Sequence, residues 1–391
     1  MNTTSGTWNV SFETKCQGIN LNVKDSYHAI SFPIYQTATF SHTGLGESSG
    51  FDYTRSGNPT RSQLESIMAE LENGCGALAM SSGMSAIATF FELLSPGDHV
   101  IVDRDLYGGS VRLFDKVLKR KGIKFTTADL FSEDISDVIT EDTKVVFLET
   151  PTNPMMNVID IEEISRITRS KGIMLAVDNT FLSPYFQNPL DLGADVVIHS
   201  GTKYIGGHHD TIGGFIVVKD KELEDRLRYL CNTIGSAMSP FDSWLMLRGI
   251  RTLAVRMERA EQNAMKIAEY LESCPAVCRV LYPGLKDHPG YRIMKKQARG
   301  FGAMISFAVD SPKTVKTILD NVELFYFAES LGGTETLITY PLTQTHAEVP
   351  EEIRKKNGIT DTLLRLSVGI EGADDLIAEF DRLFRLAKEQ V

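Results

Sequence analysis

The sequence lacks the features that would place the protein in a membrane, in an oxidising compartment or around a metal. No hydrophobic run reaches the length of a membrane span, and the first eight residues have neither a basic nor an apolar region. The five cysteines are odd in number and scattered, and no second Cys/His pair at metal-binding spacing accompanies Cys274 and Cys278. We therefore predict a cytoplasmic protein with reduced thiols, no membrane partner and no metal.

Basic residues are too few for a surface that binds nucleic acid. The chain carries 40 Lys and Arg against 51 Asp and Glu, which gives a net charge of -11. It has no basic stripe with interleaved aromatic residues. Both properties argue against nucleic acid as a partner.

The pattern of the 391 residues predicts an arm and two domains. Residues 1–55 are extended and interrupted by proline, which predicts an arm that lies on a neighbouring subunit. Residues 56–250 alternate apolar strands with helices, and this βαβ pattern predicts a large, mainly parallel sheet covered by helices on both faces. Residues 251–391 predict a smaller α+β domain. The expected strands are 77–80, 99–103, 124–127, 144–149, 174–178, 196–199, 214–218, 302–309 and 363–368; the expected helices are 60–71, 85–94, 111–121, 161–171, 252–272, 312–319 and 373–389.

Two of these strands end in groups that suit one cofactor. The strand at 196–199 leads into Ser200, Thr202 and Lys203, and the strand at 174–178 ends in Asp178. Pyridoxal phosphate needs a lysine for a Schiff base and an anion against its pyridine nitrogen. Ligands of open α/β sheets bind at the carboxyl ends of the strands. A loop lysine is more often a solvated charge, and Asp178 could instead cap a helix, so the pair is stronger than either residue alone.

A turn of small residues predicts a phosphate site near that rim. Ser81–Ser85 connects a short strand to a helix, where backbone N–H groups and the helix dipole attract an anion. The turn has neither the GK[ST] ending of a nucleotide phosphate loop nor the GxGxxG pattern, which counts against a dinucleotide. A plain tight turn is the alternative. Asn153, after the strand at 144–149, is expected on the same rim.

Five segments, taken in order, resemble one enzyme family from about residue 30 to the end of the chain. These segments are Asp52–Arg61, Val177–Thr180, Ser200–Tyr204 with His208–Asp210, Ala328–Gly333 and Leu364–Gly369. They resemble the Cys/Met-metabolism (trans-sulfuration) enzymes: cystathionine γ-synthase, cystathionine γ- and β-lyases and methionine γ-lyase. The resemblance implies an α/β fold of the PLP-dependent transferase type (aspartate aminotransferase type, fold type I) with pyridoxal 5'-phosphate as cofactor.

The resemblance also implies roles for the residues that contact the cofactor. Lys203 would hold it and move protons between the substrate carbons, and Asp178 would keep the pyridine nitrogen protonated. Tyr107 would stack on the ring and assist the leaving sulfur. The remaining expected contacts are Ser200, Thr202, Gly83, Met84, Asn153 and, from a neighbouring subunit, Tyr53 and Arg55.

For the substrate, the resemblance implies a site that recognises both ends of a sulfur amino acid. Arg365 would pair with the α-carboxylate in a bidentate geometry that lysine cannot copy. Asn153 and the Ser330 backbone would assist in binding the carboxylate, and Thr345 would orient Arg365. Glu329, Asp52 and Arg112 would recognise a charged distal end, although each alone is more often a solvated charge.

The reaction expected from these residues is γ-elimination or γ-replacement on cystathionine. Gly109 stands where methionine γ-lyases have a cysteine, which makes that activity less favoured. The sequence of residues 338–346 differs from that of many γ-lyases, so a β-lyase remains an alternative. An aminotransferase is the rival from another enzyme class, whereas a non-catalytic cofactor-binding regulator would be expected to lack Lys203 or Arg365. The family usually forms homotetramers built from catalytic dimers.

Overall fold

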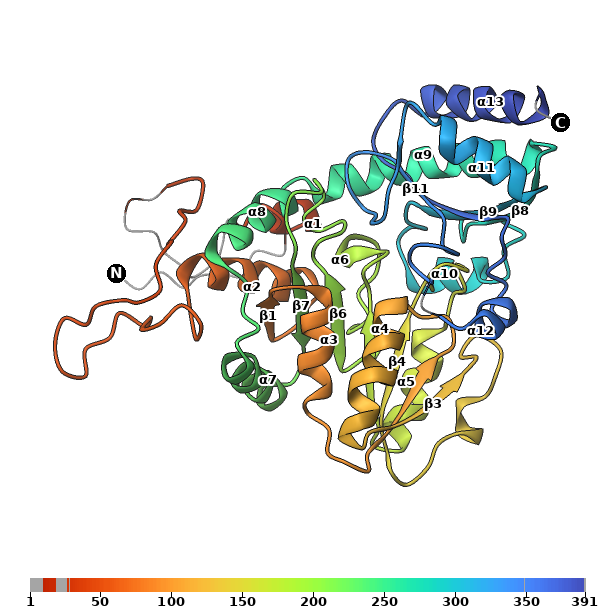
Figure 1. Ribbon diagram of the computed structural model, residues 1–391. Helices are drawn as coiled ribbons and strands as arrows, with labels where there is room; N and C mark the ends of the chain where they lie inside the picture. The colour runs from red at the N-terminus through yellow and green to blue at the C-terminus, as the bar shows by residue number, and fades with distance from the viewer. Residues whose placement is uncertain (1–9, 19–26, 28, 348, 390–391) are drawn as a thin grey trace.

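The computed structural model describes residues 10–18, 27, 29–347 and 349–389 (Figure 1). Residues 1–8, which have neither a basic nor an apolar region, lie outside this part, as do residues 19–26 and 28 of the predicted arm. Two sheets organise the described chain. No helix among the described residues is both long enough and apolar enough to cross a membrane.

The larger sheet has seven strands in the order β1-β7-β6-β5-β4-β2-β3. All strands run parallel except β7, which is antiparallel to both of its neighbours, so the predicted, mainly parallel sheet is confirmed. Their bounds are β1 (Gly76–Met80), β2 (His99–Asp103), β3 (Lys124–Ala128), β4 (Thr143–Glu149), β5 (Met174–Asp178), β6 (Val196–Ser200) and β7 (Gly214–Val218).

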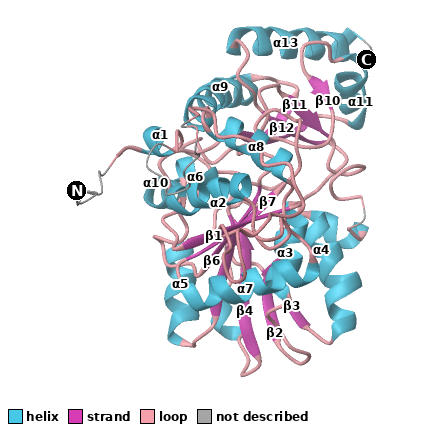
Figure 2. Cartoon of the chain, turned by 90° about the vertical axis from the view of Figure 1, so that its left-hand side faces the viewer, coloured by secondary structure: helices cyan, strands magenta, loops and turns pink. Residues whose placement is uncertain are grey.

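Helices cover both faces of this sheet, as Figure 2 shows. Alternate residues of β4 point to opposite faces: Phe147 joins one apolar cluster and Leu148 another. Both faces are therefore buried, which explains why the strands read as continuous apolar runs. The helices are α2 (Pro59–Leu71), α3 (Gly83–Phe91), α4 (Gly108–Leu113), α5 (Ile161–Ser170), α6 (Ser183–Phe186), α7 (Lys221–Ile234) and α8 (Pro240–Ile250).

The helix predicted at 111–121 differs from the structure. α4 begins at Gly108 and ends at Leu113, and it continues as a π-helical turn, Phe114–Leu118, and a 3-10 turn, Lys119–Lys121. The π-helical turn places the Phe114 ring 4.9 Å from the ring of Phe125 in a buried aromatic cluster. Packing of the aromatic side chains thus overrides the regular helical repeat.

The smaller sheet follows the long helix α9 (Leu253–Ser273), which Figure 1 shows running from the region of α8 towards α13 (Ala373–Glu389). Its strands lie in the order β10-β11-β12-β9-β8. The bounds are β8 (Val277–Leu281), β9 (Met304–Val309), β10 (Tyr326–Phe327), β11 (Leu337–Thr339) and β12 (Leu363–Ser367); the helices are α10 (Tyr291–Gln297), α11 (Pro312–Asn321), α12 (Glu351–Lys356) and α13.

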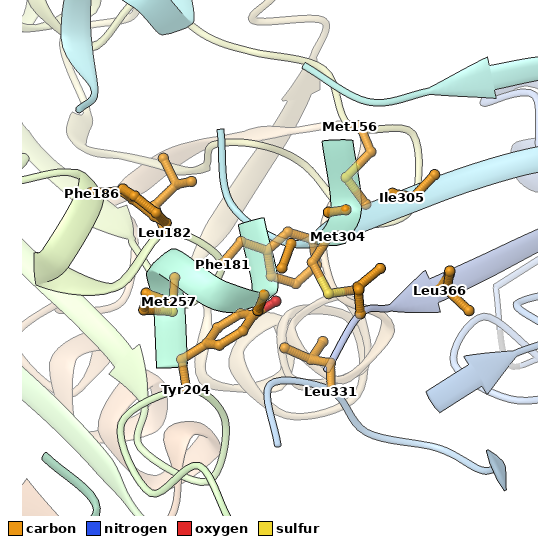
Figure 3. Packing of buried hydrophobic residues seen from close by; sticks show 14 of the residues in the cluster. Met156, Phe181, Leu182, Phe186, Tyr204, Met257, Met304, Ile305, Leu331 and Leu366 are labelled. Carbon is orange, nitrogen blue, oxygen red and sulfur yellow. The ribbon is translucent and has the colours of Figure 1, made fainter. Parts of the chain in front are cut away.

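One apolar core connects the two sheets. Tyr204, from the loop after β6, packs with Met257 of α9, Met304 of β9 and Leu331 in the same buried cluster (Figure 3). The loop that carries Lys203 is therefore held between elements of both sheets. Close packing of this kind restricts the loop to one arrangement.

Residues 29–57 extend away from the body of the subunit (Figure 1). The segment is anchored at its base, where Trp244 Nε1 donates to Phe32 O at 3.1 Å and Asn58 Nδ2 donates to Tyr35 O at 2.9 Å. Further along, the side chain of Leu45 is fully exposed and that of Tyr53 is half exposed. Upstream of this segment, the short helix α1 (Phe12–Lys15) packs against α2.

Candidate active site

A cavity of about 300 Å³ lies at the carboxyl ends of β4, β5 and β6, between the two sheets. Most of the expected site residues line this cavity: Gly83, Met84, Tyr107, Asn153, Asp178, Ser200, Thr202, Lys203, Glu329, Ser330, Thr345 and Arg365. No group of His, Cys, Asp and Glu in the described part of the chain could hold a metal ion. The cavity lining offers an amine, a guanidinium group, carboxyl groups and several hydroxyl groups.

Lys203 lies in a tight turn directly after β6. Gly206 N donates to Gly201 O at 2.8 Å, and Gly207 N donates to Lys203 O at 2.8 Å. These bonds direct the side chain into the cavity, where Nζ donates to Ser330 Oγ at 2.8 Å. Burial, with a smaller contribution from the charge of Arg365, lowers the pKa of Lys203 to about 8. An amine with this pKa is more readily available as a nucleophile and base than an ordinary lysine.

Asp178 is the last residue of β5 and faces the same cavity. Its Oδ1 accepts from Thr180 N at 3.0 Å and from Thr180 Oγ1 at 2.5 Å. Burial raises the pKa of Asp178, and the bonds from Thr180 counteract that rise. Asp178 takes part in none of the ion pairs between described residues, although His199, which pairs with Glu72, has a smaller favourable influence on its charge. A protonated pyridine nitrogen would supply the missing positive charge, so this side of the cavity fits the cofactor's ring.

The turn before α3 meets β6 and β7 at very close range. Ser82 caps α3 by accepting from Ser85 N at 3.0 Å. The first N–H groups of a helix have no intrahelical acceptor, so those of Gly83 and Met84 are available to a ligand. A Cβ on Gly214 would lie 2.2 Å from Ser82 O, and a Cβ on Gly83 would lie 2.9 Å from Ser200 Cβ. The glycines thus bring these N–H groups beside the hydroxyl of Ser200. This arrangement fits the predicted phosphate site.

Arg365 is fully buried in β12, opposite Asn153. Its Nη1 donates to Asn153 Oδ1 at 2.9 Å, and its Nη2 donates to Ser330 O at 3.1 Å and Thr339 Oγ1 at 3.3 Å. Nε has no partner. Burial lowers the pKa of Arg365 to about 10. A charged, buried guanidinium group with a free N–H is suited to a carboxylate ligand.

The expected contact between Thr345 and Arg365 is not among the hydrogen bonds of the described residues. Thr345 lines the cavity, but its hydroxyl pairs with His346 Nδ1 at 2.8 Å. The hydroxyl that contacts Arg365 belongs to Thr339, which is the register partner of Arg365 in β11. The register of two short strands decides which hydroxyl is near, and the sequence does not reveal this register.

Glu149 is a cavity residue that the sequence analysis missed. It ends β4, is buried, and accepts from Tyr107 N with both oxygens, at 3.0 and 3.2 Å. This contact fixes the backbone of Tyr107, whose ring lines the cavity. The strand at 144–149 was predicted to end at this rim, and this placement was the one signal that pointed to Glu149.

Four of the expected site residues lie outside the cavity lining of their own subunit: Asp52, Tyr53, Arg55 and Arg112. Asp52 accepts from Ser48 Oγ at 2.6 Å on the extended segment. Arg55 Nη1 donates to Asn232 O at 2.6 Å, and its guanidinium group lies over the Tyr53 ring. Contacts of the first three residues with the cofactor or substrate of a neighbouring subunit therefore stay predictions.

Next to the cavity is a wider hollow of about 1050 Å³, and Glu329, Ser330 and Thr202 line both. Carboxylates of Asp210, Asp242, Glu329 and Glu335 line the hollow together with His209, whereas the described residues of its lining include no Lys or Arg. The mouth of the cavity in the described subunit therefore has a negative character.

The comparisons with known proteins agree with this geometry. The sequence profile of the Cys/Met metabolism PLP-dependent enzymes matches residues 13–385. A cystathionine beta-lyase of Lactococcus lactis is 47% identical over 94% of this chain and 97% of its own length. A cystathionine gamma-lyase of Bacillus subtilis is 48% identical over 90% of this chain and 93% of its own.

Solved structures extend the likeness to the fold. The cystathionine gamma synthase of Xanthomonas oryzae pv. oryzae, solved with aminoacrylate and cysteine, has a TM-score of 0.95 and is 42% identical. The match covers 98% of this chain and all of that chain. The predicted fold class is thereby confirmed. The chain belongs to the Cys/Met metabolism PLP-dependent enzymes, and its cofactor is pyridoxal 5'-phosphate.

Proposed function

We propose that the protein acts on cystathionine by γ-elimination or γ-replacement at the bond between the γ-carbon and sulfur. The observation that carries this proposal is the acidic hollow beside Lys203 and Arg365. Arg365 suits the α-carboxylate at one end of the substrate, and Glu329 at the mouth suits a distal ammonium group. Methionine has no distal ammonium group, so an enzyme specific for methionine would have no use for an acidic hollow.

The cofactor, when bound, stores the electrons released at the substrate's α-carbon. In our proposal, the protein's own residues hold it and move the protons. Asp178 would keep a positive charge on the ring, and Tyr107 would stack on it. Ser200, Thr202 and the first N–H groups of α3 would hold the phosphate.

Lys203 carries the proton transfers of the proposed reaction. Its amine would take the proton from the α-carbon and deliver it to the bound cofactor. The amine, free again, would then take a second proton from the β-carbon, which allows the γ-substituent to leave. Ser330 Oγ, 2.8 Å from Nζ, orients the amine. Tyr107 assists the leaving sulfur. Arg365 and Asn153 fix the carboxylate so that the α-carbon stays within reach of Lys203.

The alternative reaction is β-elimination, which needs only the first of the two proton removals. Two observations make β-elimination the second candidate. The sequence of residues 338–346 differs from that of many γ-lyases, and cystathionine beta-lyases are among the similar proteins. We further propose that the protein works in the cytoplasm as a homotetramer of catalytic dimers.

The experiment that tests the function supplies L-cystathionine to the purified enzyme loaded with cofactor, and identifies the keto acid. We expect 2-oxobutyrate with cysteine, which establishes γ-elimination. Pyruvate with homocysteine would instead establish the β-lyase. If neither forms but an O-acylhomoserine and cysteine give cystathionine, the enzyme is the synthase. Release of pyridoxamine phosphate with a requirement for a keto-acid acceptor would contradict the proposal and indicate an aminotransferase.

Two variants provide the controls. Lys203→Ala is expected to abolish turnover of every substrate. Glu329→Gln is expected to raise KM for cystathionine by roughly tenfold, because a charge-assisted hydrogen bond to the distal ammonium group is weakened. The same variant should affect an O-acylhomoserine less, since that substrate has no distal ammonium group.

A further inference from the structure

Two carboxyl groups lie side by side at the rim of the larger sheet. β4 and β5 are parallel neighbours, and Glu149 and Asp178 form the last register pair between them. Register partners on parallel strands project to the same face, and the two strands are about 4.8 Å apart. Both residues line the cavity of the active site. Any charge on one carboxyl group is therefore felt strongly by the other.

The surroundings of Glu149 offer little positive charge to balance an anion. The groups that act on it are the carboxyls of Asp178, Asp105 and Asp103, and the N–H of Tyr107. Burial, with these carboxyl groups, raises the pKa of Glu149 well above its ordinary value.

The cations of the same cavity have other partners. Lys203 Nζ donates to Ser330 Oγ, and Arg365 donates to Asn153 Oδ1, Ser330 O and Thr339 Oγ1. None of the ion pairs between described residues includes Glu149. His199 has a favourable influence on the charge of Asp178 but not on that of Glu149. Two adjacent buried carboxylates that lack an ion-pair partner are unfavourable, and one of the pair keeps its proton.

The cofactor decides which of the two carboxyl groups is charged. Its pyridine nitrogen brings one positive charge, and one carboxylate balances it. Asp178 is prepared for that charge, because its Oδ1 accepts two hydrogen bonds from Thr180. Glu149 instead accepts the backbone N–H of Tyr107. This bond favours the charged form, but burial and the carboxyl group of Asp178 oppose it more strongly, and a neutral acid still accepts the N–H through its carbonyl oxygen.

We propose that Glu149 remains protonated in the working enzyme and acts as a neutral positioning residue, which holds the backbone of Tyr107 against the cofactor. Its neutrality leaves Asp178 as the single negative charge beside the pyridine nitrogen. The geometry of β4 and β5 thus separates two roles: the charge resides on Asp178, and Glu149 provides the hydrogen bond that fixes the stacking residue.

The test compares three variants of the full-length enzyme by their dissociation constants for pyridoxal phosphate. Glu149→Ala removes the acceptor of Tyr107 N and is expected to weaken cofactor binding by about tenfold. Glu149→Gln has the shape of the neutral acid and keeps a carbonyl oxygen, so it is expected to restore binding to within about threefold of the native enzyme. Asp178→Asn removes the charge and is expected to weaken binding by about 100-fold or more.

A spectroscopic measurement detects the proton directly and does not depend on activity. The holoenzyme is expected to show the infrared C=O stretching band of a protonated carboxylic acid, and Glu149→Gln should remove it. Asp105→Asn is the matched control, because Asp105 is a buried carboxyl on the same rim but bonds Thr152 and not Tyr107. The proposal is overturned if Glu149→Gln loses as much cofactor affinity as Asp178→Asn, or if it leaves the infrared spectrum unchanged. If Glu149→Ala fails to fold, the Gln variant and the infrared band still decide.

Discussion

Arg365 shows how a single buried residue connects the smaller sheet to the chemistry of the larger one. It stands in the middle of β12 between Leu364 and Leu366, in a buried strand where an unpaired charge is costly. Three acceptors from three segments, Asn153, Ser330 and Thr339, reduce that cost and orient the guanidinium plane. Because Nε remains without a partner, the group has a donor left for a ligand. With fewer acceptors, the side chain of Arg365 could adopt conformations that point away from the cavity.

We predict that Arg365→Lys raises KM far more than it lowers kcat. A lysine ammonium group cannot reproduce the fork, and the loss of one charged hydrogen bond costs about 1.5–3 kcal/mol, or roughly 10- to 100-fold in kcat/KM. The carboxylate contact is the same in the ground state and the transition state, so the loss should be expressed mainly in KM. Steady-state kinetics with cystathionine measure both constants.

The hydroxyl next to Arg365 provides a matched pair of variants for the same measurement. Thr339→Val removes a partner of Nη2 and is expected to raise KM by a few-fold. Thr345→Val removes a partner of His346 and should have the smaller effect. Equal effects of the two substitutions would contradict the assignment of Thr339 as the orienting residue.

At the scale of elements, the cofactor site depends on how closely β7 approaches the turn before α3. Gly214 begins β7 and pairs with Met80 and Ser200 of the neighbouring strands. Its missing side chain leaves room for Ser82 O, which an added Cβ would meet at 2.2 Å. β7 therefore sets the position of the first N–H groups of α3, although no side chain of β7 lines the cavity.

We predict that Gly214→Ala weakens binding of pyridoxal phosphate by about tenfold or more, because the added methyl group displaces the Ser82–Gly83 turn. Equilibrium titration of the full-length protein with the cofactor measures the effect. Val218→Ala, at the far end of β7, is the control: it should lower the free energy of unfolding by about 2 kcal/mol and leave the cofactor affinity unchanged. A normal affinity in Gly214→Ala would show that the turn tolerates the displacement.

The elements also show what the sequence could and could not predict. The strands at 99–103 and 174–178 were predicted with the observed bounds, because continuous apolar runs identify strands buried on both faces. α7 and β8 were missed, since partly exposed segments have mixed patterns. Lys203, Asp178 and Arg365 were recognised from motifs in the sequence. Glu149 and Thr339 were not, because their roles depend on strand register, and register is a property of tertiary structure.

At the scale of the whole molecule, the described subunit leaves apolar side chains on its surface that suit a partner. Ile30 and Leu45 of the extended segment are fully or almost fully exposed. Tyr326 and Phe327, beside the acidic hollow, are partly exposed. Tyr53 and Arg55 lie on the same segment and away from their own cavity. These features support an assembly in which the segment of one subunit completes the site of another.

We predict that two inactive variants restore activity when they are mixed. Lys203→Ala disables the site of its own subunit, whereas Arg55→Ala disables the site of its neighbour if Arg55 acts across the interface. After the subunits reassort, half of the dimers are mixed, and each mixed dimer has one intact site, so an equimolar mixture should recover about a quarter of the native activity. The control mixture combines Lys203→Ala with Arg365→Ala, both of which act within their own cavity, and it should recover none. Activity assays on mixtures that were mildly denatured and refolded together measure the recovery. If both mixtures stay inactive although native and tagged subunits demonstrably exchange, Arg55 does not serve the neighbouring site.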